Sequence, residues 1–140
     1  MSQSKILAID YGTKRLGIAV SHASLAEPLK VIANDNQVFD RLVELCKQLQ
    51  VEQVIVGLSE NQMAAKTKAF VKQLAQVLPG ELRPQLVDET LTSQEVRRRL
   101  QQQGIKYKKR QGSIDHYAAA LILTDYLAHP VAKEIPLTED

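Results

Sequence analysis

The segment Gln53–Leu58 constrains the fold most, because it is a nearly continuous apolar run between two segments with helical periodicity. A strand with apolar side chains on both faces is typical of a sheet that helices cover on both sides. Residues 38–49 carry an apolar stripe at helical spacing, with Asn36 as the expected N-cap, and residues 64–78 carry a second stripe. The alternation of helix and strand predicts parallel strands joined by right-handed crossovers.

The first third of the chain follows a different pattern. It contains three short apolar segments joined by tight links, at residues 5–10, 16–20 and 29–33. These segments predict three sequential antiparallel strands. A further strand is expected at residues 85–88, and helices are expected at residues 92–103 and from Ser113 onward. The predicted fold class is therefore α/β, a mixed five-stranded sheet with three antiparallel and two parallel strands and helices on both faces.

The size and composition of the chain fit one globular domain. It has 140 residues, of which 44% are hydrophobic and 24% charged. We expect a single domain over residues 1–129 and a flexible, aperiodic tail over residues 130–140. The single cysteine, Cys46, excludes an intrachain disulfide. The sequence shows neither a signal peptide nor an apolar run near the ~18 residues of a membrane span, so we expect a cytoplasmic protein without a membrane partner.

Basic residues are concentrated in one segment. Seven of the 18 Lys and Arg residues lie within residues 97–110, which contain no Asp or Glu. They are Arg97, Arg98, Arg99, Lys106, Lys108, Lys109 and Arg110. Such a cluster can bind phosphate groups, although the solvated end of a helix and a loop would explain it equally well. The cluster suggests a nucleic acid without establishing one.

Carboxylates occur at the ends of three expected elements. Asp10 ends the first strand, Asp88 and Glu89 end the fifth, and Asp115 lies in the first turn of the last helix. Ligands of α/β folds bind where strands end, and three clustered acids are costly unless a cation neutralises them. Oxygen ligands suit Mg²⁺ or Mn²⁺, and one or two such ions can catalyse phosphodiester hydrolysis. Each acid taken singly is explained better as a cap or a surface charge, whereas the set predicts a metal site.

The loop after Asp10, residues 11–15, is a second candidate for ligand binding. Gly12 permits a tight turn or the close approach of a phosphate, which Lys14 and Arg15 could contact. An ordinary hairpin loop would look the same. Tyr11 could stack on a base or pack in the core. Such hairpins occur in nucleases and in the phosphate-binding lobes of kinases, but a chain of 140 residues is too short for the two lobes that a kinase needs.

Four segments together resemble the YqgF (RuvX) family: DYGTKRLGIAVS at 10–21, VIVGL at 54–58, DETLTSQEV at 88–96 and SIDHYAAALILTDYL at 113–127. The family has the ribonuclease H-like fold and is related to Holliday junction resolvases. Its members are described as such resolvases or as nucleases that mature the 5′ end of pre-16S rRNA. The resemblance extends from about Lys5 to Leu127.

The resemblance implies a nuclease in which Asp10, Glu89 and Asp115 are the catalytic ligands of Mg²⁺ or Mn²⁺. Glu89 is preferred to Asp88 because adjacent strand residues point to opposite faces. Lys14 and Arg15 match basic residues of the family's hairpin. They would bind the nucleic-acid backbone together with five residues of the basic cluster, namely Arg97, Arg98, Lys108, Lys109 and Arg110. The implied substrate is structured RNA, as pre-16S rRNA or on an assembling ribosomal subunit, with branched DNA as the alternative.

Two positions depart from the family pattern. Thr90 stands where the family usually has an arginine, and threonine provides no charge to hold a phosphate. The family usually continues the VIVGL segment with a proline, then a methionine and a glycine, whereas this chain has Ser59, Met63 and then Ala64–Ala65. These differences keep open a binding module of the same fold with weak or no catalysis, although the three retained acids argue against it.

Overall fold

The computed structural model describes residues 5–23, 25–58, 63–88, 111–128 and 133–134, with backbone only at residues 58, 63, 88, 111–117 and 133–134. The elements follow in the order β1 (Ile6–Asp10), β2 (Arg15–His22), β3 (Leu25–Ala33), α1 (Val38–Leu49), β4 (Gln53–Leu58), α2 (Met63–Val77), a 3₁₀ turn (Gly80–Leu82), β5 (Gln85–Asp88), α4 (Gln111–Ala128) and β6 (Lys133–Glu134). The helix expected at residues 92–103 lies outside the described residues.

The described strands form one mixed sheet in the order β3-β2-β1-β4-β5-β6. β1 pairs antiparallel with β2 and parallel with β4, β2 pairs antiparallel with β3, and β4 pairs parallel with β5. The predicted arrangement of three antiparallel and two parallel strands is confirmed. The sheet also has a sixth strand that the sequence pattern did not indicate, since Lys133 and Glu134 pair antiparallel with Leu86 and Gln85. Two residues are too few to show the alternation of a strand in the sequence. Their pairing satisfies some of the backbone N–H and C=O groups on the outer edge of β5.

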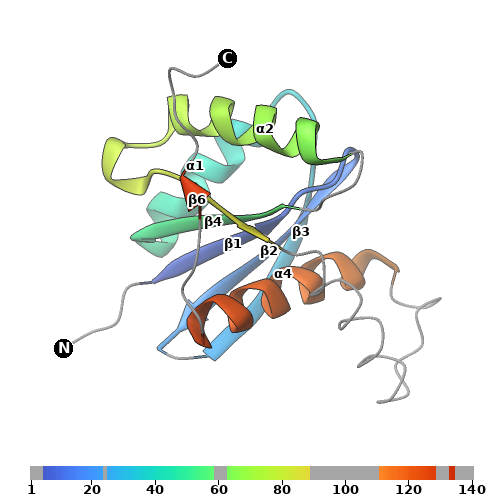
Figure 1. Cartoon of the computed structure of the whole chain (residues 1–140), viewed down its shortest axis with the longest axis vertical. Helices are drawn as coiled ribbons and strands as arrows, with labels where there is room; N and C mark the ends of the chain where they lie inside the picture. Colours follow the sequence, from blue (N-terminus) through green and yellow to red (C-terminus); the bar gives the residue numbers. More distant parts are fainter. Residues whose placement is uncertain (1–4, 24, 59–62, 89–110, 129–132, 135–140) are drawn as a thin grey trace.

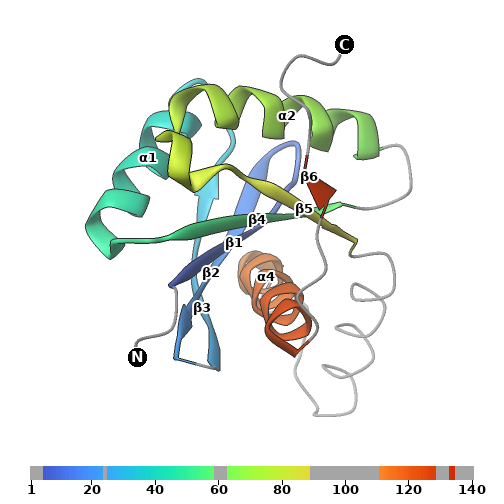
Figure 2. The same cartoon turned by 60° about the vertical axis from the view of Figure 1, so that its left-hand side comes forward.

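Helices cover both faces of the sheet, as predicted. Figures 1 and 2 show α1 and α2 on one face and α4 on the other. Alternate side chains of β1 divide between the two cores: Leu7 and Ile9 pack with residues of α1 and α2, whereas Ile6 and Ala8 pack with residues of α4. The strand is therefore apolar on both faces, and its last residue, Asp10, continues the alternation on the α4 face.

The third strand begins earlier than expected. β3 starts at Leu25, four residues before the predicted start, and it includes Pro28. Pro28 lies opposite Ala19, where the register between β2 and β3 shifts. Because β3 is at the edge of the sheet, the missing N–H group of proline is tolerated there.

The N-cap of the first helix is Gln37 and not the predicted Asn36, and Asp35 holds the turn before the helix. The Gln37 N–H donates to Oδ1 of Asp35 at 3.0 Å, and the Val38 N–H donates to the Asp35 carbonyl at 3.0 Å. Arg41 also donates to Asp35 Oδ1 at 2.8 Å. Glutamine is not among the preferred N-cap residues, so the sequence favoured the neighbouring asparagine.

The last helix also starts earlier than predicted. α4 begins at Gln111, so residue 115 lies in its second turn and not in its first. The helix packs over β1, β2 and β3 through buried residues that include Ala119, Ile122 and Leu123. None of the helices in the described part of the chain is long and apolar enough to cross a membrane.

Candidate functional site

Asp10 lies at the carboxyl end of β1 between two glycines. Its cross-strand partner in β2 is Gly17, and its partner in β4 is Gly57. Cross-strand neighbours on one face of a sheet have the closest side chains, so two glycines leave space on both sides of the Asp10 carboxylate. The side chain of Asp10 is half-buried, on the face that α4 covers. A carboxylate at a strand end beside two glycines is a suitable place for a cation.

The course of α4 brings its N-terminal half toward Asp10. The Gln53 amide donates to the Tyr126 hydroxyl at 2.6 Å, and Gln53 is the cross-strand partner of Ile6 at the start of β1. Residue 115 is about 16 Å before Tyr126 along the helix axis, and Asp10 is about 13 Å beyond Ile6 along the strand. Because α4 runs in the opposite direction to β1 (Figure 1), its N-terminal half lies toward the carboxyl end of β1, where Asp10 is the last residue.

Residue 115 also lies on the appropriate face of the helix. It precedes the buried Ala119 by four residues, which is about one turn, and therefore lies on the face that packs against the sheet. A site shared by Asp10 and Asp115 stays a prediction, because the position of the Asp115 carboxylate is not described.

The end of β5 forms the third part of the site. Asp88 is its last residue and pairs with Leu58, next to the pair formed by Gly57 and Val87. Val87 packs in the core on the α4 face of the sheet, and Leu86 packs in the core on the opposite face. The choice of Glu89 over Asp88 depends on this alternation. Glu89 itself lies outside the described residues.

The prediction of a metal site therefore rests on Asp10 and on backbone geometry. Within the described ranges, no three Asp, Glu, His or Cys side chains form a group that could hold a metal ion. Two of the three predicted ligand side chains, those of Glu89 and Asp115, are not among the described side chains. Thr90, Ser59 and the basic residues Arg97, Arg98, Lys108, Lys109 and Arg110 also lie outside the described part of the chain.

The β1–β2 loop that follows Asp10 forms a tight turn. A Cβ atom at Gly12 would lie 2.5 Å from the backbone oxygen of Arg15, so glycine is required at this position. Lys14 and Arg15 are exposed at the end of this turn, close in sequence to Asp10. Their exposure is compatible with the predicted contact with a nucleic-acid backbone.

Contacts from outside the hairpin hold the same loop. The Tyr11 ring packs against Phe70 of α2 with a centroid distance of 4.9 Å, which favours the packing role of Tyr11 over base stacking. Asn34, just after β3, donates from Nδ2 to the Gly12 carbonyl at 2.8 Å and from its backbone N–H to the Lys14 carbonyl at 3.0 Å. Sequence patterns did not point to Asn34, because these hydrogen bonds span about 20 residues and leave no local pattern.

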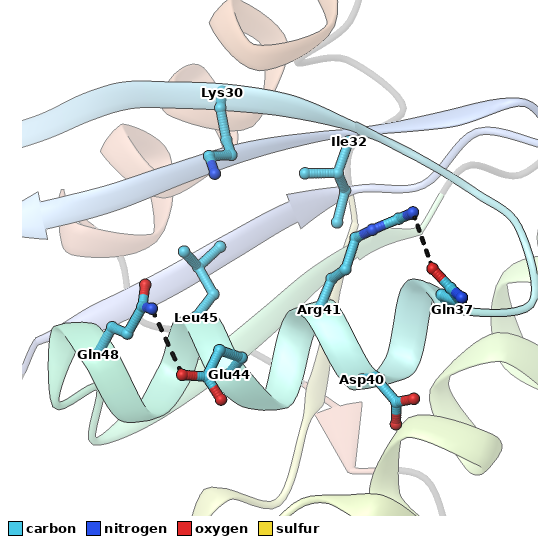
Figure 3. Close-up of a pocket in the computed structure, with 8 residues that line it drawn as sticks. All are labelled: Lys30, Ile32, Gln37, Asp40, Arg41, Glu44, Leu45 and Gln48. Carbon is cyan, nitrogen blue, oxygen red and sulfur yellow. Dashed lines mark hydrogen bonds between the residues drawn. The ribbon is translucent and has the colours of Figure 1, made fainter.

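A separate pocket of about 490 Å³ lies between β3 and α1 (Figure 3). Lys30 and Ile32 extend into it from β3, on the face opposite α4. Its wall on α1 contains both acidic and basic side chains, namely Asp40, Arg41 and Glu44. The mixed charge does not suggest a phosphate site.

Comparison with known proteins assigns the family. The family model described as RuvX: Holliday junction resolvase matches residues 4–129. The chain belongs to the RuvX family. Among the similar RuvX-family relatives is a protein of Sulfurihydrogenibium sp. (strain YO3AOP1) named "Putative pre-16S rRNA nuclease", which is 36% identical over 132 residues, or 89% of this chain and 90% of the relative. A Bacteroides fragilis protein of the same name is 36% identical over 138 residues, or 89% of this chain and 96% of the relative.

Solved structures show the same fold. RuvC of Thermus thermophilus in complex with a Holliday junction substrate matches with a TM-score of 0.62 and 19% identity, over 95% of this chain and 100% of that chain. A second T. thermophilus RuvC structure matches with a TM-score of 0.59 and 20% identity, over 94% and 99% of the two chains. The predicted ribonuclease H-like fold is thereby confirmed for this RuvX-family protein.

Proposed function

We propose that this protein is a metal-dependent nuclease that hydrolyses phosphodiester bonds in the cytoplasm during maturation of the 5′ end of pre-16S rRNA. The observation that carries the proposal is the position of Asp10 at the end of β1, between Gly17 and Gly57 and on the face that α4 covers. The names of the similar RuvX-family relatives support the choice of substrate. The rRNA would be free or part of an assembling ribosomal subunit.

The residues at this site fit a divalent cation. Asp10 offers carboxylate oxygens, the ligands that Mg²⁺ and Mn²⁺ prefer, and glycines on both neighbouring strands leave room for an ion with its waters. Glu89 and Asp115 are the proposed further ligands. A bound ion would supply activation of the attacking water and stabilisation of charge on the leaving 3′ oxygen.

The chain itself would bind and orient the substrate. Asp10 is fixed at the end of a central strand, so its carboxylate is presented by a rigid element. Lys14 and Arg15 are exposed at the adjacent turn and would bind backbone phosphates as charged donors. The predicted basic cluster, residues 97–110, would extend this contact and make binding depend on salt.

The proposal is tested by cleavage of a labelled RNA that carries the pre-16S 5′ leader, in Mg²⁺, Mn²⁺ or EDTA. Asp10→Asn should lower the rate more than about 100-fold, because changes even outside the ligand shell of a metal site cost 10–100-fold. Asp40→Asn is the matched control, since Asp40 is an exposed aspartate on α1, across the sheet from α4. If folded Asp10→Asn cleaved the RNA at the wild-type rate, Asp10 would not be part of the catalytic site. If the folded wild-type protein did not cleave the RNA, the proposal would be overturned.

A second candidate function is cleavage of branched DNA, because the family model is described as a Holliday junction resolvase. The same carboxylates would serve this reaction. Cleavage of a four-way junction at two symmetric positions requires a two-fold symmetric dimer. Metal-dependent cleavage of a labelled four-way junction without cleavage of the RNA would establish this candidate in place of the first.

A third candidate is a module that binds nucleic acid with weak or no catalysis. Thr90, which stands where the family usually has an arginine, favours it. The expected sign of such a module is tight binding of either substrate without metal-dependent turnover. If the threonine at position 90 causes the weak catalysis, Thr90→Arg should raise the rate of cleavage. If it is not the cause, Thr90→Arg should leave the rate unchanged.

A further inference from the structure

The loop between β1 and β2 is held from two sides, by Tyr11 and by Asn34. The ring of Tyr11 packs on Phe70, and Phe70 in turn stacks with Phe39 of α1 at 5.4 Å between ring centroids. These contacts fix the beginning of the loop against the core on the α1 and α2 face. They leave the turn itself, from Gly12 to Lys14, to be fixed by something else.

Asn34 fixes the turn through two hydrogen bonds. Its Nδ2 atom donates to the Gly12 carbonyl at 2.8 Å, and its backbone N–H donates to the Lys14 carbonyl at 3.0 Å. The two acceptors lie on either side of Thr13, so Asn34 bridges the tip of the turn. Glycine has the largest backbone freedom of all residues and has no side chain with which to restrict it. A donor from another element can supply the missing restriction.

Asn34 is itself held by its neighbours on both sides. Asp35 accepts hydrogen bonds from the start of the helical segment, at its side chain from the N-cap Gln37 and at its carbonyl from Val38, the first residue of α1. Arg41 donates to Asp35 Oδ1 at 2.8 Å and to the Ala33 carbonyl at 3.4 Å. Asn34, whose side chain holds the turn, therefore lies in the hydrogen-bonded junction between β3 and α1.

We infer that Asn34 is a positioning residue of the nucleic-acid site, which holds the Gly12–Lys14 turn so that the Lys14 ammonium faces a backbone phosphate beside Asp10. The inference rests on the proposed function. Asn34 acts through Lys14 and does not touch the nucleic acid. Without the Asn34 amide the turn samples other conformations, in which the Lys14 ammonium no longer meets the phosphate and its contact is lost.

The test measures binding of the labelled RNA in EDTA, where no cleavage occurs, as a function of salt. The proteins are the wild type, Asn34→Ala, Lys14→Ala and the double variant. Lys14→Ala and Asn34→Ala should each weaken binding about threefold to tenfold and lower the magnitude of the salt slope by about 0.7–0.9, the amount expected for one phosphate contact. In the double variant, Asn34→Ala should add nothing to Lys14→Ala.

Asn36→Ala is the matched control, because Asn36 is an exposed asparagine two residues further on. It should bind as the wild-type protein does. Asn34→Ser, whose side chain is too short to reach the Gly12 carbonyl, repeats the test with a second variant. Melting temperatures are measured for all variants, and amide hydrogen exchange of residues 11–15 should accelerate in both Asn34 variants.

The outcomes separate this inference from the proposed function. An unchanged affinity and salt slope in both Asn34 variants, with a lower melting temperature only, would overturn the inference and leave a purely structural role. Equal losses from Asn34→Ala in the presence and absence of Lys14 would overturn it too. If the wild-type protein fails to bind the RNA or a four-way junction, the proposed function fails, and this inference falls with it.

Discussion

Asp10 and Gly57 are direct partners across the parallel pair of β1 and β4. Gly17 takes the corresponding place in β2, so no side chain flanks the carboxylate on either neighbouring strand. A central pair of strands is otherwise filled with large apolar residues, and the residues before Gly57, Val54 to Val56, are completely buried. The gap beside Asp10 is therefore a local exception in a densely packed sheet, and it lies where the proposed cation would bind.

Filling this gap should impair the site more than the fold. Gly57→Val would place a branched side chain beside the Asp10 carboxylate, while valine itself is favoured in strands. We expect the Mn²⁺ concentration for half-maximal cleavage to rise at least about tenfold, as for other changes beside metal ligands. Ile55→Val, two residues earlier on the same face, is the control and should leave this concentration unchanged. Equal metal dependence in both variants would show that the gap has no part in the site.

The turn at Gly12 allows a test of the loop geometry by stability alone. A Cβ atom there would lie 2.5 Å from the Arg15 backbone oxygen, whereas a Cβ atom at Gly80 would have nothing within 4 Å. Gly12→Ala should therefore lower the free energy of unfolding by about 1–3 kcal/mol, because the new Cβ atom would clash with that oxygen and the backbone would have to shift. Gly80→Ala should change it by less than about 0.5 kcal/mol. Urea denaturation of the two variants measures the difference, and equal stabilities would contradict the tight turn.

The sequence predicted best what depends on local periodicity. The run Gln53–Leu58 indicated a strand buried on both faces, and Val54, Ile55 and Val56 are all 0% exposed. The extent of β3 was missed because Pro28 is acceptable only on an edge strand, and the position of a strand in the sheet is not a local property. The pairing of Lys133 with Leu86 depends on a distant partner for the same reason.

The features of the site were likewise predictable only where they are local in the sequence. Asp10 was found because an acid at the end of an apolar strand is visible in the sequence. Gly17 and Gly57 became neighbours of Asp10 only through the strand register, and Asn34 reached the loop only through the return of β3 beside β2. The roles of Glu89, Asp115 and the basic cluster stay predictions from the sequence.

Cys46 should be unreactive in the folded protein. It is 4% exposed, and burial raises the pKa of its thiol to about 11. At neutral pH only about one molecule in 10⁴ carries the reactive thiolate, and the side chain is also shielded from reagents. Labelling with a thiol-specific disulfide reagent should therefore follow unfolding of the protein, with a rate that rises sharply in urea. Rapid labelling without urea would show that α1 opens locally. Cys46→Ala provides the blank.

The stabilising contribution of Asp35 should be lost in acid. The hydrogen bond from the Gln37 N–H lowers the pKa of its carboxyl below the ordinary value, and Arg41 lowers it further. A lowered pKa in the folded state means that the unfolded chain binds protons more readily. The stabilisation is therefore complete above the ordinary pKa of an aspartate and is lost as the pH falls through the lower pKa of the folded protein.

Asp35→Asn isolates this contribution, because the asparagine side-chain oxygen can still accept the hydrogen bond from the Gln37 N–H but the side chain does not titrate. Urea denaturation of both proteins from neutral to acidic pH should show the wild type more stable at neutral pH, with the difference shrinking as the carboxyl is protonated. Asp40→Asn, in the first turn of the same helix, controls for the change of charge alone. A stability difference between wild type and Asp35→Asn that stays constant with pH would contradict the assignment. Asn34 lies between Ala33 and Asp35. The same pH series, measured as RNA binding at constant salt, therefore reports whether the hydrogen bonds of Asp35 also support the Gly12–Lys14 turn.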